Sequence, residues 1–349
     1  MAKKSHPSPR SSRVTILDVA LAAGVSKSSV SRLLDERLPR SNSEAAQKVR
    51  RIAKELGYVR DVSAANLRRG STSMIGLIVP RLTDTVMAML YEALQRAAAK
   101  SSKLVIVATT DETIEAERRA ADSLIGKGVD ALILATARND DPFIKELDER
   151  GVKYVLALRT DGTSLSSIGN DELGGYLATR HLIDLNHSRI GIIAGPSYAS
   201  TACERTKGYR KAMAEAGLEI DETLVVESTF GIESGRDAAN QLMSSPLPPT
   251  AIFAVNDNIA IGAFAAIHSL GLSVPDDVSL VGYNDIPIVS HLYTPMTSVH
   301  VPFDQIAASA LDLLKTEEVP EDQRIQVAMP SLIPRSSSTA IPSQAKETK

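Results

Sequence analysis

The pattern of hydrophobic positions changes near residue 73 of the 349-residue chain. Before that point, apolar residues recur at the spacing of one helix face, with polar residues between them. After it, short continuous apolar runs alternate with helical patterns, and such runs are typical of strands buried on both faces of a parallel sheet. The sequence therefore predicts a small helical N-terminal part followed by a larger α/β region.

Residues 14–34 are predicted to form two short helices joined by a tight turn. Thr15 and Asp18 have the spacing of a capping box, so the first helix begins next to Thr15. Gly24 permits the turn, and Ser26 is a suitable N-cap for the second helix. Two short helices around a glycine turn are the arrangement of a helix-turn-helix.

The second of these helices has two different faces. At about 100° per residue, one side carries Val30, Leu33 and Leu34, and the other carries Lys27, Ser28, Ser31 and Arg32. A helix pair that presents Lys, Ser and Arg near the start of its second helix fits docking into a DNA major groove. The alternative is an ordinary solvated helical hairpin.

Two further segments complete the N-terminal part. Residues 41–58 are a predicted third helix, with Ser41 and Glu44 at its capped start and Gly57 at its end. Residues 61–72 contain too few large apolar side chains to bury a face, which predicts a flexible linker. A weakly helical segment of this kind could also fold on contact with DNA.

The α/β region contains two successive sets of apolar runs. These predicted strands are residues 74–79, 104–108, 131–134 and 154–158, then 189–195, 224–228, 251–255 and 278–283. Helical patterns separate them, so two doubly wound subdomains are predicted rather than one sheet. A last helix, residues 303–315, lies between short strands at 297–301 and 325–329. The polar tail from Ser336 is expected to be loose.

Charge is distributed unevenly along the chain. Residues 1–72 hold 15 Lys and Arg against 6 Asp and Glu, whereas the remainder holds 24 against 36, for a net charge of -3. A basic N-terminal part on an acidic body indicates a polyanionic partner for the N-terminal part only.

Other features disfavour membrane and secreted proteins. No apolar run approaches the ~20 residues that span a bilayer, and the basic N-terminus leads into no apolar segment. We therefore expect a cytoplasmic protein without a secretory signal. The single Cys203 cannot form an internal disulfide, and we interpret it as a packing residue rather than a nucleophile.

Enzyme and transport functions are also disfavoured. No G-x-G-x-x-G follows the first strand, no P-loop is present, and the six His show no metal-ligand spacing. We expect no catalytic residue, no cofactor and no metal site. The alternative is a solute-binding receptor without a DNA role, which leaves the basic N-terminal part unexplained.

Eight segments resemble, in the same order, the lactose-repressor/galactose-repressor (LacI/GalR) family of bacterial transcription regulators. They are VTILDVALAAGVSKSSVSRLL from residue 14, ELGY from 55, SAANLRRG from 63, IGLIVP from 75, HLIDLNHSRIGIIAGP from 181, ERTKGYRKAM from 204, AIFAVNDNIAIGA from 251 and VPDDVSLVGYNDIP from 274. The resemblance spans about residues 13–338, and the set of motifs is more specific than any one of them.

The resemblance implies an all-α helix-turn-helix headpiece and an α/β core of two doubly wound parallel-sheet subdomains, similar to periplasmic binding proteins. The implied divisions are a disordered basic arm (1–12), the DNA-binding domain (13–60), a hinge (61–72), the effector-binding and dimerisation core (73–340) and a loose tail (341–349). Within the core, the N-subdomain is about 73–169 plus 300–328, and the C-subdomain about 170–298 plus 329–340.

The resemblance also implies a homodimeric repressor that reads two half-sites of a near-palindromic operator. Lys27, Ser28 and Arg32 match the family's base-reading positions, and Thr15, Ser26 and Ser31 would contact phosphates. Leu67 matches the hinge leucine that wedges into the minor groove, although it could be a plain linker residue. The tail carries no leucine heptad, so a dimer is expected rather than a zipper-linked tetramer.

The implied effector is a small carbohydrate that binds between the subdomains and alters operator affinity by population shift, as inducer or corepressor. Arg205 and Asp257 match the family's regular ligand-contacting positions, and Arg81, Thr85, Arg159 and Asp171 are assigned to the same site. Asp257 could instead cap the helix that begins there; a capping Asp would still have one free oxygen.

The chain departs from the family pattern around this site. Residues 82–86 lack the usual aromatic segment, Leu158 replaces an acid found in several members, and Asn170 and Asp171 stand in reverse order. Fewer aromatic and acidic groups, with three arginines converging, suggest an anionic effector such as a sugar phosphate or sugar acid. The three arginines are Arg81, Arg159 and Arg205.

Overall fold

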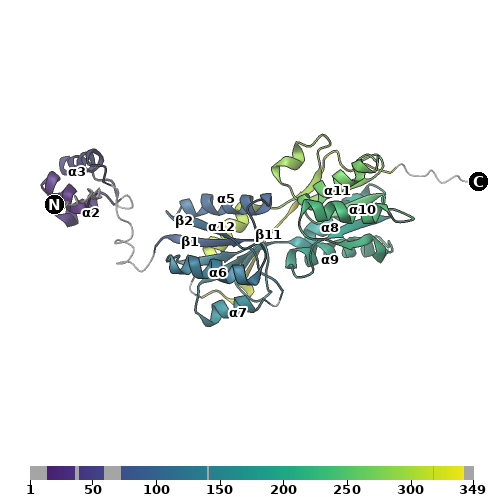
Figure 1. The fold of residues 1–349 in the computed structure, drawn as a ribbon, viewed down its shortest axis with the longest axis horizontal. Helices are drawn as coiled ribbons and strands as arrows, with labels where there is room; N and C mark the ends of the chain where they lie inside the picture. Colours follow the sequence, from purple (N-terminus) through teal and green to yellow (C-terminus); the bar gives the residue numbers. More distant parts are fainter. Residues whose placement is uncertain (1–13, 36–38, 59–71, 140, 317, 342–349) are drawn as a thin grey trace, which may run out of the picture. The chain divides into compact units, whose positions relative to one another are not determined.

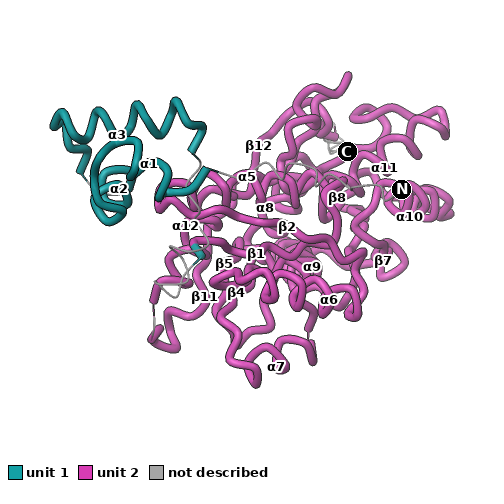
Figure 2. The backbone as a smooth tube through the Cα atoms, turned by 60° about the vertical axis from the view of Figure 1, so that its left-hand side comes forward, with its two compact units in different colours: residues 1–72 teal, residues 73–349 magenta. Residues whose placement is uncertain are grey.

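The computed structural model describes residues 14–35, 39–58, 72–139, 141–316 and 318–341. The chain divides into two compact units, residues 1–72 and 73–349, which we call the headpiece and the core (Figure 2). The predicted basic arm and Leu67 lie outside the described residues.

Three helices form the described headpiece: α1 (Ile16–Ala23), α2 (Lys27–Leu33) and α3 (Glu44–Glu55). The predicted capping box is confirmed, because the Thr15 N–H donates to Asp18 at 2.7 Å and the Asp18 N–H donates to the Thr15 hydroxyl. Gly24 ends α1 with φ 71°, a left-handed conformation that glycine adopts without strain.

A compact apolar cluster holds the three helices together. It contains Val19, Ala20, Ala23, Val30, Val49 and Ala53. The predicted cap of the third helix was two residues early, because Ser43 and not Ser41 accepts the free N–H, from Ala46. The headpiece is thus a small domain with its own core.

The first lobe of the core is a six-stranded parallel sheet in the order β11-β5-β4-β3-β1-β2. Helices α5 and α12 cover one face, and α6 and α7 cover the other (Figure 1). The strands are β1 (Met74–Val79), β2 (Leu104–Thr109), β3 (Ala131–Leu134), β4 (Tyr154–Ala157), β5 (Ser166–Gly169) and β11 (Ile325–Ala328). The helices are α5 (Thr85–Ala99), α6 (Ile114–Gly126), α7 (Pro142–Glu149) and α12 (Phe303–Leu313).

The second lobe repeats this arrangement in the order β12-β10-β9-β8-β6-β7, parallel except for β12, which pairs antiparallel with β10. Its strands are β6 (Ile190–Ala194), β7 (Val225–Glu227), β8 (Ala251–Ala254), β9 (Ser279–Asn284), β10 (Thr297–His300) and β12 (Ser331–Ile333). Its helices are α8 (Asp171–Asp184), α9 (Ser200–Glu215), α10 (Ile232–Met243) and α11 (Asp257–Ser269). Short 3₁₀ turns occupy Glu222–Leu224, Pro287–Ser290 and Glu321–Gln323.

The predicted fold class is confirmed by these two doubly wound sheets. Strands β5 and β12 were not predicted, since SSIG and SLI lack the long apolar runs of their neighbours. The prediction that the tail is loose from Ser336 was wrong. Ser337 is fully buried, and its carbonyl accepts from the Leu280 N–H at 2.7 Å, so the polar tail is fixed by hydrogen bonds to the sheet.

Glycines allow helices α8 and α9 of the second lobe to pack very closely. A Cβ atom on Gly208 of α9 would contact the Glu172 carbonyl of α8, and one on Gly175 of α8 would contact the Arg205 carbonyl of α9. Such approach of two backbones leaves no room for a methyl group. Close packing of α8 on α9 therefore fixes where the side chains of both helices point.

We predict that Gly208→Ala destabilises the core by about 1–3 kcal/mol through overpacking. The matched control is Gly126→Ala in α6, where a Cβ atom meets nothing within 4 Å. That control should stabilise the protein by about 0.5–1 kcal/mol, because alanine is the better helix former. Denaturant unfolding measures both, and equal effects of the two substitutions would contradict the account.

Candidate functional site

The predicted DNA-contacting face of α2 is exposed. Lys27, Ser28 and Arg32 are exposed and Ser31 is half-buried, whereas Val30 packs into the headpiece core. Ser26 caps the helix by accepting the Ser29 N–H at 3.1 Å. The helix therefore presents a short row of donors to its surroundings.

Thr15 is exposed at the start of α1. The Thr15 N–H and the Thr15 hydroxyl each donate to the Asp18 carboxylate at 2.7 Å, and these two hydrogen bonds lower the pKa of Asp18. A phosphate contact from this hydroxyl therefore requires the cap to open, because the hydroxyl has one hydrogen to donate and Asp18 accepts it. Thr15 remains a predicted phosphate contact, and forming that contact costs the hydrogen bond of the cap.

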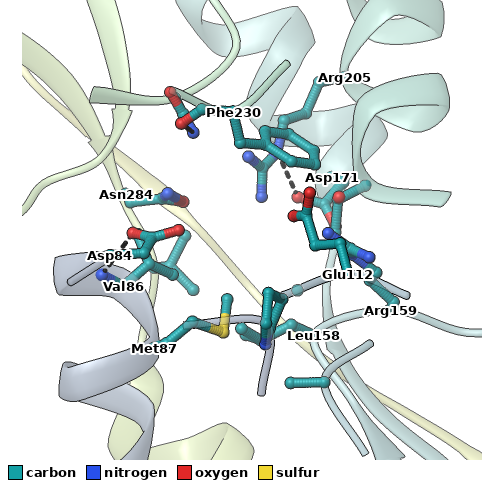
Figure 3. Close-up of a pocket in the computed structure, with 16 residues that line it drawn as sticks. Asp84, Val86, Met87, Glu112, Leu158, Arg159, Asp171, Arg205, Phe230 and Asn284 are labelled. Atoms are coloured by element: carbon teal, nitrogen blue, oxygen red, sulfur yellow. Dashed lines mark hydrogen bonds and ion pairs between the residues drawn. The ribbon is translucent and has the colours of Figure 1, made fainter. Parts of the chain in front are cut away.

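A pocket lies between the two lobes of the core (Figure 3). Most lining residues follow the carboxyl ends of strands in both sheets, where doubly wound folds bind ligands. The lining comprises Pro80, Asp84, Val86, Met87, Glu112, Ala135, Leu158, Arg159, Gly169, Asp171, Thr201, Arg205, Phe230, Asn256, Asn284 and Val301.

Arg205 is held by a buried polar cluster at one wall of the pocket. Its Nε donates to Asp171 at 2.8 Å, its Nη1 donates to the Val255 carbonyl at 2.7 Å, and its guanidinium lies 3.7 Å from the centre of the Tyr283 ring. The Tyr283 hydroxyl also donates to Asp171, at 3.0 Å. Burial alone would lower the pKa of Arg205, but Asp171 and Tyr283 hold it above its ordinary value.

Arg159 has a different environment. It is 5% exposed, and its Nη1 donates to the Thr136 carbonyl at 3.3 Å. Its guanidinium lies 5.4 Å from the Phe230 ring centre and 5.8 Å from that of Tyr198. Burial lowers the pKa of this guanidinium.

Hydrogen bonds join the two lobes around the pocket. The Asn258 amide of α11 donates to Asp84, the N-cap of α5, at 3.1 Å. On the other side, the Asn139 N–H donates to the Tyr198 carbonyl at 2.9 Å, and the Thr160 N–H donates to Ser200 at 3.0 Å. Burial raises the pKa of Asp84. These contacts close the lobes on the pocket.

The structure brings Arg159, Asp171 and Arg205 together in the lining, but not Arg81 or Thr85. Arg81 is exposed and pairs with Glu112 at 3.4 Å, and Thr85 is the first residue of α5. The expected convergence of three arginines is therefore incomplete. Three acids, Asp84, Glu112 and Asp171, also line the pocket.

The interpretation of Asp257 as a helix cap with a free oxygen is wrong. Asn256 caps α11 by accepting the Ile259 N–H at 2.7 Å. Asp257 is fully buried, and its two oxygens accept from the Ile286 N–H and the Ser298 hydroxyl. It lies outside the lining, and burial raises its pKa to about 7.

Sequence reasoning missed several lining residues of the second lobe, among them Phe230, Asn256 and Asn284. Asn256 and Asn284 stand at or just past the ends of β8 and β9, and Phe230 follows β7. The signal was available, because ligands meet such positions in parallel sheets. Phe230 also supplies an aromatic group from the second lobe, so the pocket does not lack one.

Positive φ angles occur at three lining positions, Glu112, Leu158 and Asn284. Leu158 has φ 66° and Asn284 has φ 105°, each at the end of a strand. Leucine rarely adopts this region, and such backbone strain concentrates where side chains must be aimed at a ligand.

In the described part of the chain, no cluster of three or more His, Cys, Asp or Glu is arranged to hold a metal ion. Among the same residues, no helix combines the length and apolar character needed to cross a membrane.

Two family models match the chain. "Bacterial regulatory proteins, lacI family" matches residues 15–61, and "Periplasmic binding proteins and sugar binding domain of LacI family" matches residues 72–332. The chain belongs to the LacI family. This LacI-family protein is a DNA-binding transcriptional repressor with a domain of the family's sugar-binding type.

Several relatives match this LacI-family chain over nearly its whole length. The ribose operon repressor of Escherichia coli is 34% identical over 331 residues, which cover 93% of this chain and 99% of the relative. The repressor PurR of Photobacterium profundum is 31% identical over 329 residues, with coverage of 93% and 98%. These relatives are named as repressors and not as enzymes.

Solved structures of transcriptional regulators are also similar to this chain. The complex of the transcriptional regulator CelR with cellobiose matches with a TM-score of 0.71 at 30% identity and covers 93% of this chain and 100% of that chain. The Lac repressor dimer bound to operator and the anti-inducer ONPF matches with a TM-score of 0.81 at 27% identity, with coverage of 94% and 99%.

Glu117 is linked to the pocket residue Arg159 through Thr136. It is 2% exposed and accepts a hydrogen bond from the Thr136 hydroxyl, and the Thr136 carbonyl accepts from Arg159. Burial raises the pKa of Glu117 to about 7. The folded protein therefore keeps a proton that the unfolded chain releases near pH 4.5, the ordinary value.

Because the folded-state pKa is raised, we predict that this group's contribution to stability falls as pH rises from about 4.5 to about 7. Glu117→Gln should remove that dependence. Relative to wild type, the free energy of unfolding of the variant should rise by about 2–3 kcal/mol between pH 5 and pH 8, at about 1.4 kcal/mol per pKa unit. Denaturant unfolding at both pH values measures it. Glu115→Gln, an exposed position on the same helix, is the control, and parallel curves for both variants would refute the assignment.

Proposed function

We propose that this repressor binds a near-palindromic operator as a homodimer and that a carbohydrate-class effector, bound between the lobes, controls its operator affinity. The observation that carries the proposal is the polar pocket closed by hydrogen bonds between two lobes of one core. A ligand there contacts both lobes at once, so its binding changes how they sit.

The headpiece supports the DNA-reading part of the proposal. Lys27, Ser28 and Arg32 are base-reading residues in this account; Arg and Lys pair with guanine O6 and N7, and Ser is less selective. Ser26, Ser31 and Thr15 contact phosphates, which hold register without reading sequence. Leu67, outside the described residues, remains the predicted minor-groove wedge.

The dimer follows from how little one headpiece can read. Three base-reading side chains on one helix specify only a few base pairs. Two headpieces one DNA turn apart, about 34 Å, double the site and explain a near-palindromic operator. The similarity to the Lac repressor dimer bound to operator supports this assembly.

The pocket supports a carbohydrate-class effector. Carboxylates and amides such as Asp84 and Asn284 can accept from or donate to ring hydroxyls, and Phe230 can pack on the apolar face of a sugar ring. The similarity to the ribose operon repressor and to a cellobiose complex supports the same class. We assign no catalytic role to these residues.

Selection of bound sites from random DNA, with and without candidate effectors, tests the proposal. We predict recovery of a two-fold symmetric site by the full chain. Arg32→Ala should cost about 1–3 kcal/mol in operator affinity and relax base preference at one position per half-site.

The control is Lys100→Ala, which removes an exposed positive charge from the core and should leave operator affinity unchanged. Recovery of no consensus site, or an equal loss from both substitutions, would refute the DNA-reading assignment.

A further inference from the structure

Arg159 is the arginine of the pocket lining without a carboxylate partner. Among the described residues, no carboxylate oxygen lies within ion-pair distance of its guanidinium, and its one hydrogen-bond acceptor is the Thr136 carbonyl. By contrast, Arg205 is paired with Asp171. Both guanidinium groups are buried, so the difference between them concerns charge and not exposure.

An unpaired buried charge is unfavourable, because burial removes its water without supplying an opposite charge. The two aromatic rings near Arg159 offset part of this cost through cation–π contact. The Nε and Nη2 donors of Arg159 have no hydrogen-bond partner among the described residues. An incoming anion can take both donors, which is the geometry guanidinium groups form with carboxylates and phosphates.

The three acids of the lining do not cancel this charge. Asp171 is neutralised by Arg205 at 2.8 Å. Glu112 lies on the Arg159 side of the pocket and its charge favours the charged form of Arg159, but it makes no ion pair with that guanidinium and lies 3.4 Å from Arg81 (Figure 3). Asp84 lies with Asn284 on the side of the pocket opposite Arg159 (Figure 3). The pocket therefore has a cationic side at Arg159 and a hydroxyl-accepting side at Asp84.

Apolar groups lie between these two sides. Figure 3 shows Phe230 at one end of the pocket and Met87 with Leu158 at the other. A ligand that is polar at two opposite positions and apolar between them satisfies the whole lining.

We propose that the effector is an anionic carbohydrate, whose carboxylate or phosphate group binds Arg159 while its hydroxyls bind Asp84 and Asn284. This rests on the proposed function, since it names the chemical class of the same effector. Carboxylate and phosphate share the chemistry that Arg159 recognises, and the experiment separates them.

The test is calorimetric titration of the full chain with matched sets of probes. The first set holds a neutral sugar, its acid and its phosphate ester: ribose, ribonate and ribose 5-phosphate. The second holds glucose, its two acids gluconate and glucuronate, and glucose 6-phosphate. At least one anionic probe should bind, with its neutral counterpart at least about 30-fold weaker. Binding of acids alone identifies a carboxylate ligand, and binding of esters alone identifies a phosphate.

Arg159→Met should lower the affinity for the anionic ligand by about 30-fold or more, and Arg159→Lys should recover part of that loss. The matched control is Arg138→Met, because Arg138 is nearby, stacks on Tyr198 at 4.4 Å and lies outside the lining. That control should retain affinity within about threefold.

A second measurement needs no ligand. Without effector, Arg159→Met should unfold at the same or a higher temperature than wild type, because it removes an unpaired buried charge. Arg205→Met should unfold at a lower temperature, because it leaves Asp171 buried without a counterion. If Arg159→Met unfolds below wild type as Arg205→Met does, Arg159 is a structural residue and the inference is overturned.

The remaining outcomes separate the inference from the proposed function. If neutral sugars bind and shift operator affinity equally in wild type and Arg159→Met, the effector class is overturned and the proposed function stands. If anions bind equally to both, or no anionic probe binds, the inference is also overturned. Failure of operator selection would instead overturn the proposed function.

Discussion

The buried ion pair between Arg205 and Asp171 is the constraint on which the pocket depends. Asp171 begins α8 directly after the chain leaves β5 of the first lobe, and Arg205 projects from α9, which packs against α8 through glycines. Tyr283 of β9 and the Val255 carbonyl complete the cluster. Because these groups satisfy one another, they fix one wall of the pocket before any ligand arrives.

The contacts that join the two lobes are single hydrogen bonds and not a buried ion pair. Asp84 and Asn258 meet from different lobes through one hydrogen bond, and Asn139 and Thr160 each donate to the second lobe through backbone N–H groups. Each such bond contributes only about 0.5–1.5 kcal/mol net. A rigid wall beside a few weak cross-lobe bonds is suited to two positions of the lobes, between which a ligand selects by differential affinity.

Sequence reasoning recovered the fold where burial alone decides it. Continuous apolar runs identified the long strands, and the capping box at Thr15 located α1, because both signals are local. Short strands with small or polar residues, such as β5, were missed because their burial comes from neighbours distant in sequence. Ser337 was missed for the same reason, since its partners lie in β9 and β10.

The candidate site was recovered less completely. Arg159, Asp171 and Arg205 line the pocket as expected, whereas Asp257 does not. Its neighbour Asn256 does, because Asn256 is the N-cap in an extended conformation, whereas Asp257 is the first residue of α11. Sequence locates the loop at the end of a strand, but cap geometry decides which residue faces the ligand. The pairing of charges, which distinguishes Arg159 from Arg205, likewise depends on contacts between elements far apart in the chain.

The central claim is that occupancy of the pocket and occupancy of the headpiece are linked. The most direct test is the effector dissociation constant of the full chain, measured by calorimetry with and without saturating operator DNA. Linkage predicts a change by the same factor by which the effector changes operator affinity, typically about 5–150-fold. An effector dissociation constant that is identical with and without operator would contradict the account.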